Sequence, residues 1–387
     1  MSRAILLGLF YCAVFVGTGA SLPYMPVWFR AQGLSGVEIG AILAGPMLAR
    51  LFVTPILAVW ADGFAIRRTP MILLALAAGV SYGLIGLVAG FPAWLALWVA
   101  GSSFLSTVIP LADVLSLRRS RLEGFNYGVP RGIGSIAFVI ANIAMGALLT
   151  RVGVDIVVVW TSAAALLAGL AAFLLLPPDP VHETGERPGR VDRWRGVSDL
   201  LRSRPFMLAV VSTGLIQSTH AFYYAFSTLL WRGQGLSEST VGLLWATGVA
   251  AEIGFMWFLE PWRRRVGAET LVVLGGVAAL VRWSALAFAP PLWLLFPLQA
   301  LHALTFAAVF MGSLQLIDRH APARSASAAQ TISSAFSGGL VIGLATVASG
   351  PLFDAARERG YLAMSLLAVL GLLGAWRLAL ARPAAER

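Results

Sequence analysis

The sequence predicts an all-α integral membrane protein in which twelve transmembrane helices form two pseudo-symmetric six-helix bundles. Hydrophobic residues make up 58% of the 387 positions and charged residues only 12%, a balance that the surface of a soluble fold of this size would not tolerate. The apolar residues gather in runs long enough to cross a bilayer, and one long polar segment divides these runs six and six. Together these observations place the chain in a membrane.

Twelve runs reach the length of about 20 apolar residues that a helix needs to cross the hydrocarbon core. The first run has a flanking arginine, as a signal peptide would, but it continues through Pro23 and Pro26 without a convincing cleavage site. We therefore interpret it as the first transmembrane helix. The expected spans lie at roughly 5–29, 37–60, 69–90, 92–117, 125–149, 155–176, 206–230, 240–259, 270–289, 292–317, 327–352 and 361–381.

The longest polar stretch, rich in proline, glycine and charge, marks the expected domain boundary. We expect an N-terminal six-helix bundle at 1–176, a cytoplasmic linker at 177–204 and a C-terminal six-helix bundle at 205–387.

A short internal repeat supports this division. Its two copies, each followed by a further glycine, are Gln32-Gly33-Leu34-Ser35 with Gly40 and Gln234-Gly235-Leu236-Ser237 with Gly242. The offset is 202 residues, and it places Arg50 and Glu252 at equivalent positions of the two halves. Repeated halves around a midplane site are typical of secondary transporters.

The arginines predict the orientation. The chain has no lysine, and with the N-terminus inside, 20 of the 28 arginines fall in cytoplasmic segments and five in outer loops. The positive-inside rule therefore predicts that both termini are cytoplasmic, in the inner membrane of a bacterium. The same dispersal over short loops explains the net charge of +10 without nucleic acid as a partner.

Five ionisable residues interrupt the apolar spans. A charge at the bilayer centre costs about 3 kcal/mol or more on insertion scales, so such residues usually face the bundle interior and act on a substrate or proton path. They indicate a transporter, whose expected partners are a small-molecule substrate, protons and the lipid bilayer. The five residues are Asp113, Arg131, Glu252, Arg282 and His302.

Helix geometry groups these residues by depth. In the second half Glu252, Arg282 and His302 share one layer near the midplane with His220. In the first half Asp113 and Arg131 reach comparable depths across one cytoplasmic hairpin, so we expect an ion pair. For both groups two interpretations stay open: contact with substrate or protons, and a structural lock between helices.

Other candidates have weaker support. Tyr223 and Tyr224 belong to an aromatic run that either lines a cavity for an aromatic ligand or packs the bundle. Arg50 is expected to be a gating or structural partner. Asp62 at a helix end, with Arg67 in the basic loop that follows, is either a gate latch or an end cap.

Several chemistries have no signature in the sequence. The single cysteine, Cys12, allows no disulfide framework and no Cys/His metal spacing, so no metal or cofactor is expected. A Ser/His/Asp arrangement, a phosphate-binding loop and a nucleotide motif are also absent, so we predict no enzyme. A non-transporting sensor stays as an alternative, and we expect a monomer.

Longer motifs resemble the branch of the major facilitator superfamily that holds the 3-phenylpropionate transporters and, more distantly, lactose permease. The resemblance covers essentially the whole chain. In the first half it rests on Pro110-Leu111-Ala112-Asp113, Tyr127-Gly128, Arg131 and Gly134-Ser135-Ile136-Ala137-Phe138. In the second half it rests on His220-Ala221-Phe222-Tyr223-Tyr224, Val249-Ala250-Ala251-Glu252, Val281-Arg282-Trp283 and Leu301-His302-Ala303-Leu304-Thr305-Phe306.

The resemblance implies roles for the charged residues. It implies substrate binding at Asp113 and Arg131, and coupling of substrate to protons at the positions of Glu252, Arg282 and His302. The chain departs from the permease at the proton-carrying carboxylate, which is Thr305 here as in the phenylpropionate branch. Glu252 is the expected substitute, because burial favours the neutral form of a carboxylate and lets it load and release a proton; Asp113 and His302 are its rivals.

The chain departs from the family pattern at two further places. One is the loop between the second and third spans, and the other bears on the choice of substrate. Of the superfamily's loop pattern only Asp62, Arg67 and in part Arg68 remain, and Phe310 replaces a second histidine of the phenylpropionate branch. The sequence thus predicts a secondary active transporter that works by alternating access, most simply as a proton-coupled symporter of a small aromatic carboxylic acid or other organic acid. The alternatives are a proton-coupled permease for a sugar or nucleoside and an exporter of small molecules.

Overall fold

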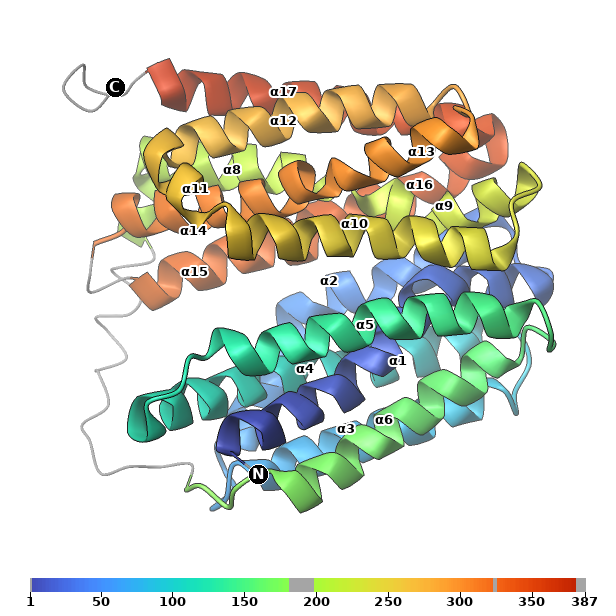
Figure 1. Ribbon diagram of the computed structural model, residues 1–387, viewed down its shortest axis with the longest axis vertical. Helices are drawn as coiled ribbons and strands as arrows, with labels where there is room; N and C mark the ends of the chain where they lie inside the picture. Colours follow the sequence, from blue (N-terminus) through green and yellow to red (C-terminus); the bar gives the residue numbers. More distant parts are fainter. Residues whose placement is uncertain (1, 181–197, 323–325, 381–387) are drawn as a thin grey trace. The chain divides into compact units, whose positions relative to one another are not determined.

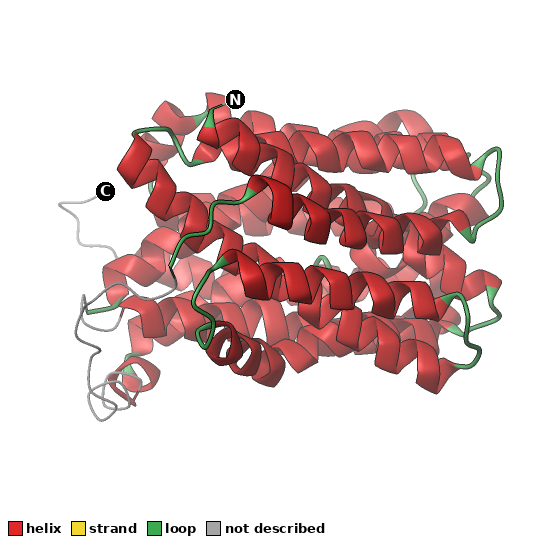
Figure 2. Cartoon of the chain, turned by 90° about the horizontal axis from the view of Figure 1, so that it is seen from below, coloured by secondary structure: helices red, strands yellow, loops and turns green. Residues whose placement is uncertain are grey.

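The computed structural model describes residues 2–180, 198–322 and 326–380, and this part of the chain is helical apart from short turns (Figures 1 and 2). Its only β-type pairing is an isolated bridge between Ile66 and Pro180. The first half contains α1 (Arg3–Ala31), α2 (Gly36–Ala61), α3 (Arg68–Ile85), α4 (Phe91–Glu123), α5 (Gly128–Leu149) and α6 (Ile156–Leu175).

The second half is divided into more and shorter helical segments. They are α8 (Arg204–Ser218), α9 (Ala221–Gly233), α10 (Glu238–Phe258), α11 (Glu260–Val266), α12 (Ala268–Leu286), α13 (Leu292–Ala300), η1 (Ala303–Ala308), α14 (Val309–His320), α15 (Ala326–Ala335), η3 (Phe336–Val341), α16 (Ile342–Ala356), η4 (Arg357–Gly360) and α17 (Tyr361–Leu380). Segments η1 and η3 are π-helical turns inside longer helices.

Ten helical stretches in the described residues are long and apolar enough to cross a membrane. This number fits the twelve spans expected from the sequence, because three of those spans are segmented differently. The expected span at 206–230 is divided into α8 and α9, neither long enough alone, and the last two expected spans form one helical stretch, Ala328–Leu380, that η4 interrupts. The all-α membrane fold is therefore as predicted.

The chain forms two compact units. Unit 1 comprises Met1–Thr184 and Ala225–Ala246, and unit 2 comprises Gly185–Tyr224 and Thr247–Arg387. Residues 225–246 thus group with the N-terminal unit, although the sequence predicts a C-terminal bundle from 205 onward. The three-part division with a linker at 177–204 stays a prediction, and residues 181–197 of that linker lie outside the described residues.

The repeated loops have the same conformation. Gly33 and Gly235 have φ angles of +89° and +85°, a left-handed region that costs other residues about 1–2 kcal/mol. The amide of Leu34 donates to the carbonyl of Phe29, and the amide of Leu236 donates to that of Trp231, again with an offset of 202. The repeat predicted from four residues is thus a repeat of structure.

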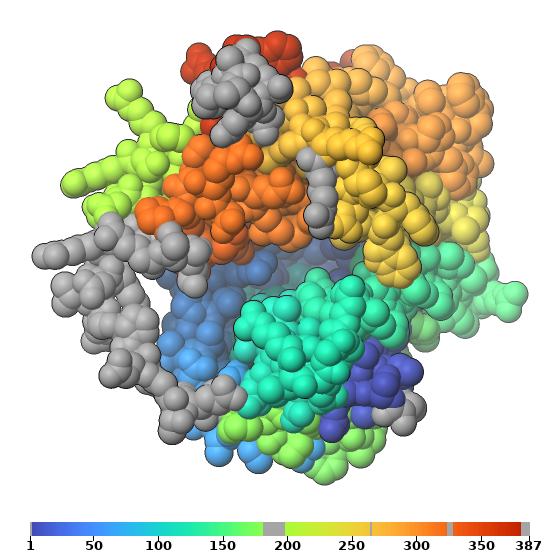
Figure 3. Space-filling view, turned by 60° about the vertical axis from the view of Figure 1, so that its left-hand side comes forward, coloured from blue at the N-terminus to red at the C-terminus, as the bar shows by residue number. Residues whose placement is uncertain are grey.

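Within unit 1, α1 packs against α5 and α6, and α3 packs between α4 and α6 (Figure 1). Gly19 of α1 allows one close approach, since a Cβ there would lie 2.5 Å from the carbonyl oxygen of Phe138 on α5. The end of α4, teal in Figure 3, lies at the surface, where Arg121, Leu122 and Glu123 are exposed. Within unit 2, α17 packs against α12 and α8.

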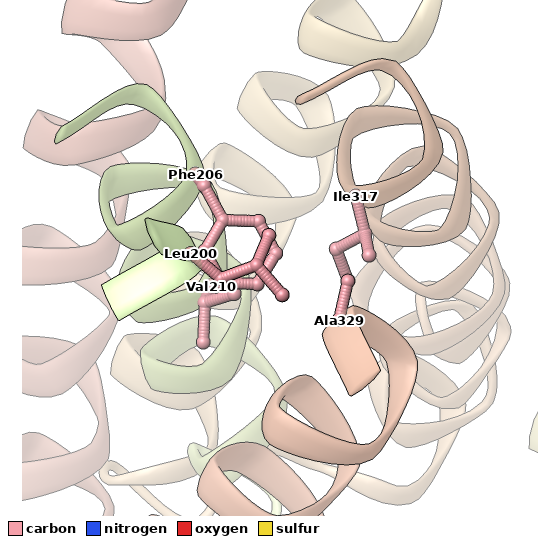
Figure 4. Close-up of a cluster of buried hydrophobic side chains, with 5 residues drawn as sticks. All are labelled: Leu200, Phe206, Val210, Ile317 and Ala329. Atoms are coloured by element: carbon pink, nitrogen blue, oxygen red, sulfur yellow. The ribbon is translucent and has the colours of Figure 1, made fainter. Parts of the chain in front are cut away.

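A small hydrophobic cluster anchors the chain where unit 2 begins. Residues 198–202 are helical, and Leu200 is buried against α8 and the facing ends of α14 and α15. Figure 4 shows the cluster, which consists of Leu200, Phe206, Val210, Ile317 and Ala329. It fixes the end of the expected linker onto unit 2.

Candidate transport site

Two of the histidines of unit 2, His220 and His302, lie where helices are interrupted. Thr219 and His220 form a turn between α8 and α9, and His302 directly precedes the π-helical turn η1. The sequence predicted continuous helices at both places. Broken helices and π-bulges are frequent at functional sites of membrane proteins, because they free backbone groups and redirect side chains toward a ligand.

A chain of polar contacts links these histidines through Arg282 of α12. One guanidinium nitrogen of Arg282 lies 3.2 Å from Nδ1 of His302 and donates to the hydroxyl of Thr305 at 3.1 Å. The Thr305 hydroxyl lies 3.0 Å from Nε2 of His220, and Nε2 of His302 lies 3.5 Å from a carboxylate oxygen of Glu252 on α10. The chain therefore runs from Glu252 through His302, Arg282 and Thr305 to His220.

The partners of the two imidazoles define which nitrogen carries a proton. Nδ1 of His220 lies 2.9 Å from the carbonyl oxygen of Gln217, so it must be the donor, and Nε2 accepts from the Thr305 hydroxyl. Nδ1 of His302 accepts from Arg282, so its Nε2 carries the hydrogen that faces Glu252. Neutral His302 thus connects a buried cation to a carboxylate.

Arg282 is fully buried and has an unusual set of neighbours. Its guanidinium carbon lies 4.7 Å from the ring centroid of Tyr223 and 4.5 Å from that of Trp283, and its second terminal nitrogen donates to the Gln299 side chain at 2.7 Å. Cation–π contacts and neutral hydrogen-bond partners stabilise a buried guanidinium, but they do not neutralise its charge.

His302 lies between Glu252 of α10 and Arg282 of α12 and contacts both side chains. The two predicted tyrosines differ: Tyr223 is buried under Arg282, and half-buried Tyr224 stacks on His220 with ring centroids 5.5 Å apart.

Unit 1 holds the second group of predicted residues. Arg131 of α5 and Asp113 of α4 form the expected ion pair, with 3.4 Å between nitrogen and oxygen. The hydroxyl of Tyr11 on α1 donates to the same carboxylate oxygen at 2.5 Å. The Arg131 guanidinium carbon lies 5.5 Å from the Tyr11 ring and 5.3 Å from the Phe15 ring. A cation, a carboxylate and two aromatic rings are thus gathered on three helices.

The predicted gating residues have mixed placements. The amide of Arg67 donates to the carbonyl of Asp179, and its Nε donates to the carbonyl of Pro180. Asp62 is the exposed C-cap residue of α2, and Arg50, half-buried on α2, joins none of these contacts in the described part of the chain.

Asp179 itself was missed by the sequence analysis. Its side chain is only 2% exposed and forms ion pairs with Arg118, at 2.9 Å, and with Arg119 at the end of α4. The Pro-Pro-Asp-Pro sequence at 177–180 was interpreted as the start of a polar linker. In the structure the ion pairs of Asp179 bind this segment to α4 of unit 1. The sequence did contain a signal for this contact: an acidic residue flanked by prolines, in a protein whose other loops on the same side are rich in arginine.

Two other residues of the site also escaped prediction. Gln299 and Tyr11 lie in apolar runs in which neutral polar residues are common, so only their spatial neighbours identify them.

Comparison with known proteins identifies the family. Residues 4–362 match the MFS_1-like family. The chain is a member of the MFS_1-like family. This assignment agrees with the predicted membership in the major facilitator superfamily and with a secondary transporter that spans the membrane many times.

Individual relatives of this MFS_1-like chain have diverse substrates in their names. It is 29% identical over 377 residues to the maltose permease of Geobacillus stearothermophilus, covering 96% of this chain and 93% of the permease. It is also 29% identical over 375 residues to a probable 3-phenylpropionic acid transporter of Escherichia coli, covering 94% of each chain.

Solved structures confirm the fold of the MFS_1-like chain. A crystal structure of the nucleoside transporter NupG matches with a TM-score of 0.83 at 15% identity, covering 98% of this chain and 99% of that one. An inward-facing bacterial homologue of the lysosomal transporter Spinster matches with a TM-score of 0.73 at 14% identity, covering 97% and 96%. At these identities the likeness shows the fold alone.

Proposed function

We propose that this transporter is a proton-coupled symporter of a small organic acid, most simply an aromatic carboxylate, and that Glu252 exchanges the coupling proton. The observation that carries the proposal is the chain from Glu252 through His302 to the buried cation Arg282. Glu252 is its most exposed member, with 19% of its side chain accessible, so it is the group that can exchange a proton with water.

The coupling follows from electrostatics in a low-dielectric site. While Glu252 is ionised, its charge attracts the His302 Nε2 hydrogen and, through the imidazole, stabilises Arg282. Protonation of Glu252 removes that attraction and leaves Arg282 a buried cation with neutral partners, which is costly. A conformation that places an anion or water near this network then becomes favourable, so proton loading and conformational change are linked.

The substrate class follows from Arg131 in unit 1. Its side chain is 37% exposed, and its guanidinium makes cation–π contacts with the rings of Tyr11 and Phe15. A guanidinium binds a carboxylate through two parallel hydrogen bonds, while neighbouring rings offer an apolar surface to an aromatic group. The relative named as a probable 3-phenylpropionic acid transporter supports this class.

A sugar is the second candidate, and Asp113 favours it. Its carboxylate accepts hydrogen bonds from Tyr11 and Arg131, and a carboxylate held in this way can also accept from sugar hydroxyl groups. The maltose permease relative is as similar to this chain as the phenylpropionate relative.

One transport experiment separates these candidates. Uptake of labelled 3-phenylpropionate and labelled maltose is measured in proteoliposomes with an imposed inward proton gradient. We expect gradient-driven uptake of the acid, loss of uptake in Arg131→Ala, and uptake that no longer responds to the gradient in Glu252→Gln. Arg151→Ala, at an exposed turn, is the matched control. Uptake of maltose but not of the acid would replace the proposed substrate, and no uptake of either would contradict both proposals.

We also propose that both termini face the cytoplasm. The support is the arginine distribution of the sequence, with Arg118, Arg119 and Arg121 at one end of α4. A membrane-impermeant thiol reagent on intact cells tests the orientation: Gly153→Cys should react and Ser2→Cys should not, each in a Cys12→Ser background. The reverse labelling would overturn it.

A further inference from the structure

A cavity of about 490 Å³ opens between α3 and α6 of unit 1, at the end opposite to Arg3. The two helices lie side by side in Figure 1. The cavity is far larger than the roughly 30 Å³ that one water molecule occupies. Its lining includes Trp28, Gly83, Gly86, Asp155, Val158 and Ser162.

The shape of the cavity follows from small residues on α3. At Gly86 a Cβ would lie 3.5 Å from Val158, so there is space opposite α6. Farther along α3 the helices are in contact: a Cβ at Gly83 would lie 3.0 Å from the Ser162 hydroxyl, and one at Gly79 only 2.6 Å from the Leu166 side chain. The lining residues of α6 run from Asp155 to Leu166. Eleven residues of helix span about 16 Å, which is roughly half of the 30 Å hydrocarbon core.

The rim of the cavity is apolar and exposed outside the protein. Leu87 is 81% exposed and Val159 60% exposed, and in a membrane protein such side chains face lipid. Apart from Trp28 and Asp155 at the mouth, the polar side chain that lines the cavity is Ser162, and it already donates to the carbonyl of Gly79 at 2.8 Å. This part of the cavity suits an acyl chain.

A carboxylate marks the mouth. Asp155 is the N-cap residue of α6, a position at which an aspartate usually accepts from its own helix. Here its side chain makes no such bond and accepts instead from Nε1 of Trp28 at 2.8 Å. The carboxylate is exposed, and tryptophan is the residue typical of the level of the headgroups.

We propose that this cavity binds a phospholipid with a primary-amine headgroup, such as phosphatidylethanolamine, with one acyl chain between α3 and α6 and the ammonium group on Asp155. Charge complementarity decides the headgroup: the carboxylate repels an anionic phosphatidylglycerol headgroup. A choline headgroup is cationic but has no hydrogen to donate, whereas a primary ammonium supplies both charge and donors. The proposal is independent of the transported substrate and of proton coupling.

Lipid-dependent thermal melting in detergent tests the proposal. Phosphatidylethanolamine, phosphatidylcholine and phosphatidylglycerol with identical acyl chains are titrated against wild type, Asp155→Asn and Gly86→Leu. The Asn variant keeps an acceptor for Trp28 but loses the charge. The Leu variant fills the cavity without strain, since Gly86 has φ −73° and its Cβ would lie 3.5 Å from the nearest side chain. Asp354→Asn, an exposed carboxylate of unit 2, is the control.

We expect phosphatidylethanolamine to raise the Tm of wild type and of Asp354→Asn more than the other two lipids do. For Asp155→Asn its apparent affinity should fall by about two- to fivefold, the size of an exposed ion pair, and become equal to that of phosphatidylcholine. Gly86→Leu should lose the response to all three lipids. An equal response of wild type to the three lipids, or an unchanged preference in Asp155→Asn, would overturn the proposal even if Gly86→Leu does not fold.

Discussion

Replacing Thr305 by valine removes one hydroxyl from the centre of the unit 2 network and changes little else. The two side chains have nearly the same shape, so packing in the π-helical turn is kept. The hydroxyl accepts from Arg282 at 3.1 Å and donates to Nε2 of His220 at 3.0 Å. Thr305→Val therefore deletes two buried side-chain contacts, one of them to a charged group, and a longer contact of the hydroxyl with the carbonyl of His302 at 3.4 Å.

The two contacts set the expected magnitude. A hydrogen bond to a charged group contributes about 1.5–3 kcal/mol, and side-chain hydrogen bonds between membrane helices contribute about 0.6 kcal/mol on average. Arg282 keeps His302 and Gln299, which lowers the first value toward its minimum. The free energy of unfolding should therefore fall by about 2 kcal/mol.

Equilibrium unfolding with sodium dodecyl sulfate in maltoside micelles measures this difference. The matched control is Thr161→Val in unit 1, whose buried hydroxyl bonds only to the carbonyl of Val157 one turn earlier. That carbonyl already belongs to the helix, so the control should change stability by less than about 0.5 kcal/mol. If Thr305→Val were as stable as the control, the hydroxyl would not connect Arg282 to His220 and the network as described would be wrong.

Three further predictions concern other parts of the chain. Asp179→Asn removes a buried carboxylate from Arg118 and Arg119 and should lower the free energy of unfolding by about 1–3 kcal/mol in the same assay, because the arginines stay partly hydrated. An unchanged free energy of unfolding would mean that these ion pairs do not stabilise unit 1. Gly235→Ala should lower the free energy of unfolding by about 1–2 kcal/mol because the φ angle of Gly235 is +85°. Gly254→Ala, in a helix with open space around it, should leave this free energy unchanged or raise it by up to about 1 kcal/mol. Equal effects of the two substitutions would contradict a role for backbone conformation. Arg131→Lys should raise the KM for 3-phenylpropionate uptake by about tenfold, since lysine lacks the two-pronged donor, with little change in Tm; an unchanged KM would remove Arg131 from the substrate site.

Much of the fold follows from the sequence because bilayer spans and repeated turns depend on local properties. A run of about 20 apolar residues is a span wherever it occurs, and the positive φ of Gly33 and Gly235 is a requirement that a short repeat reveals. The pair of Asp113 and Arg131 was predictable too, because one short hairpin joins their helices and fixes their relative depth.

The interruptions of helices were not predictable in the same way. Neither Thr219-His220 nor Leu301-His302 contains proline or glycine, the residues that usually announce a break. The side chains at the breaks have tertiary partners instead: Nε2 of His220 contacts Thr305, and His302 lies between Glu252 and Arg282. The same holds for Asp179, whose arginine partners are about sixty residues away in the chain.

The central claim is that Glu252 exchanges the coupling proton, and proton flux measured beside substrate exchange tests it most directly. Proteoliposomes that contain a pH-sensitive dye are given 3-phenylpropionate, and exchange of labelled for unlabelled substrate is followed in the same preparation. Wild type should acidify the lumen when substrate enters. Glu252→Gln should still exchange substrate but move no protons with it. Substrate-driven acidification by Glu252→Gln at the rate of wild type would contradict the account and assign the proton to another group.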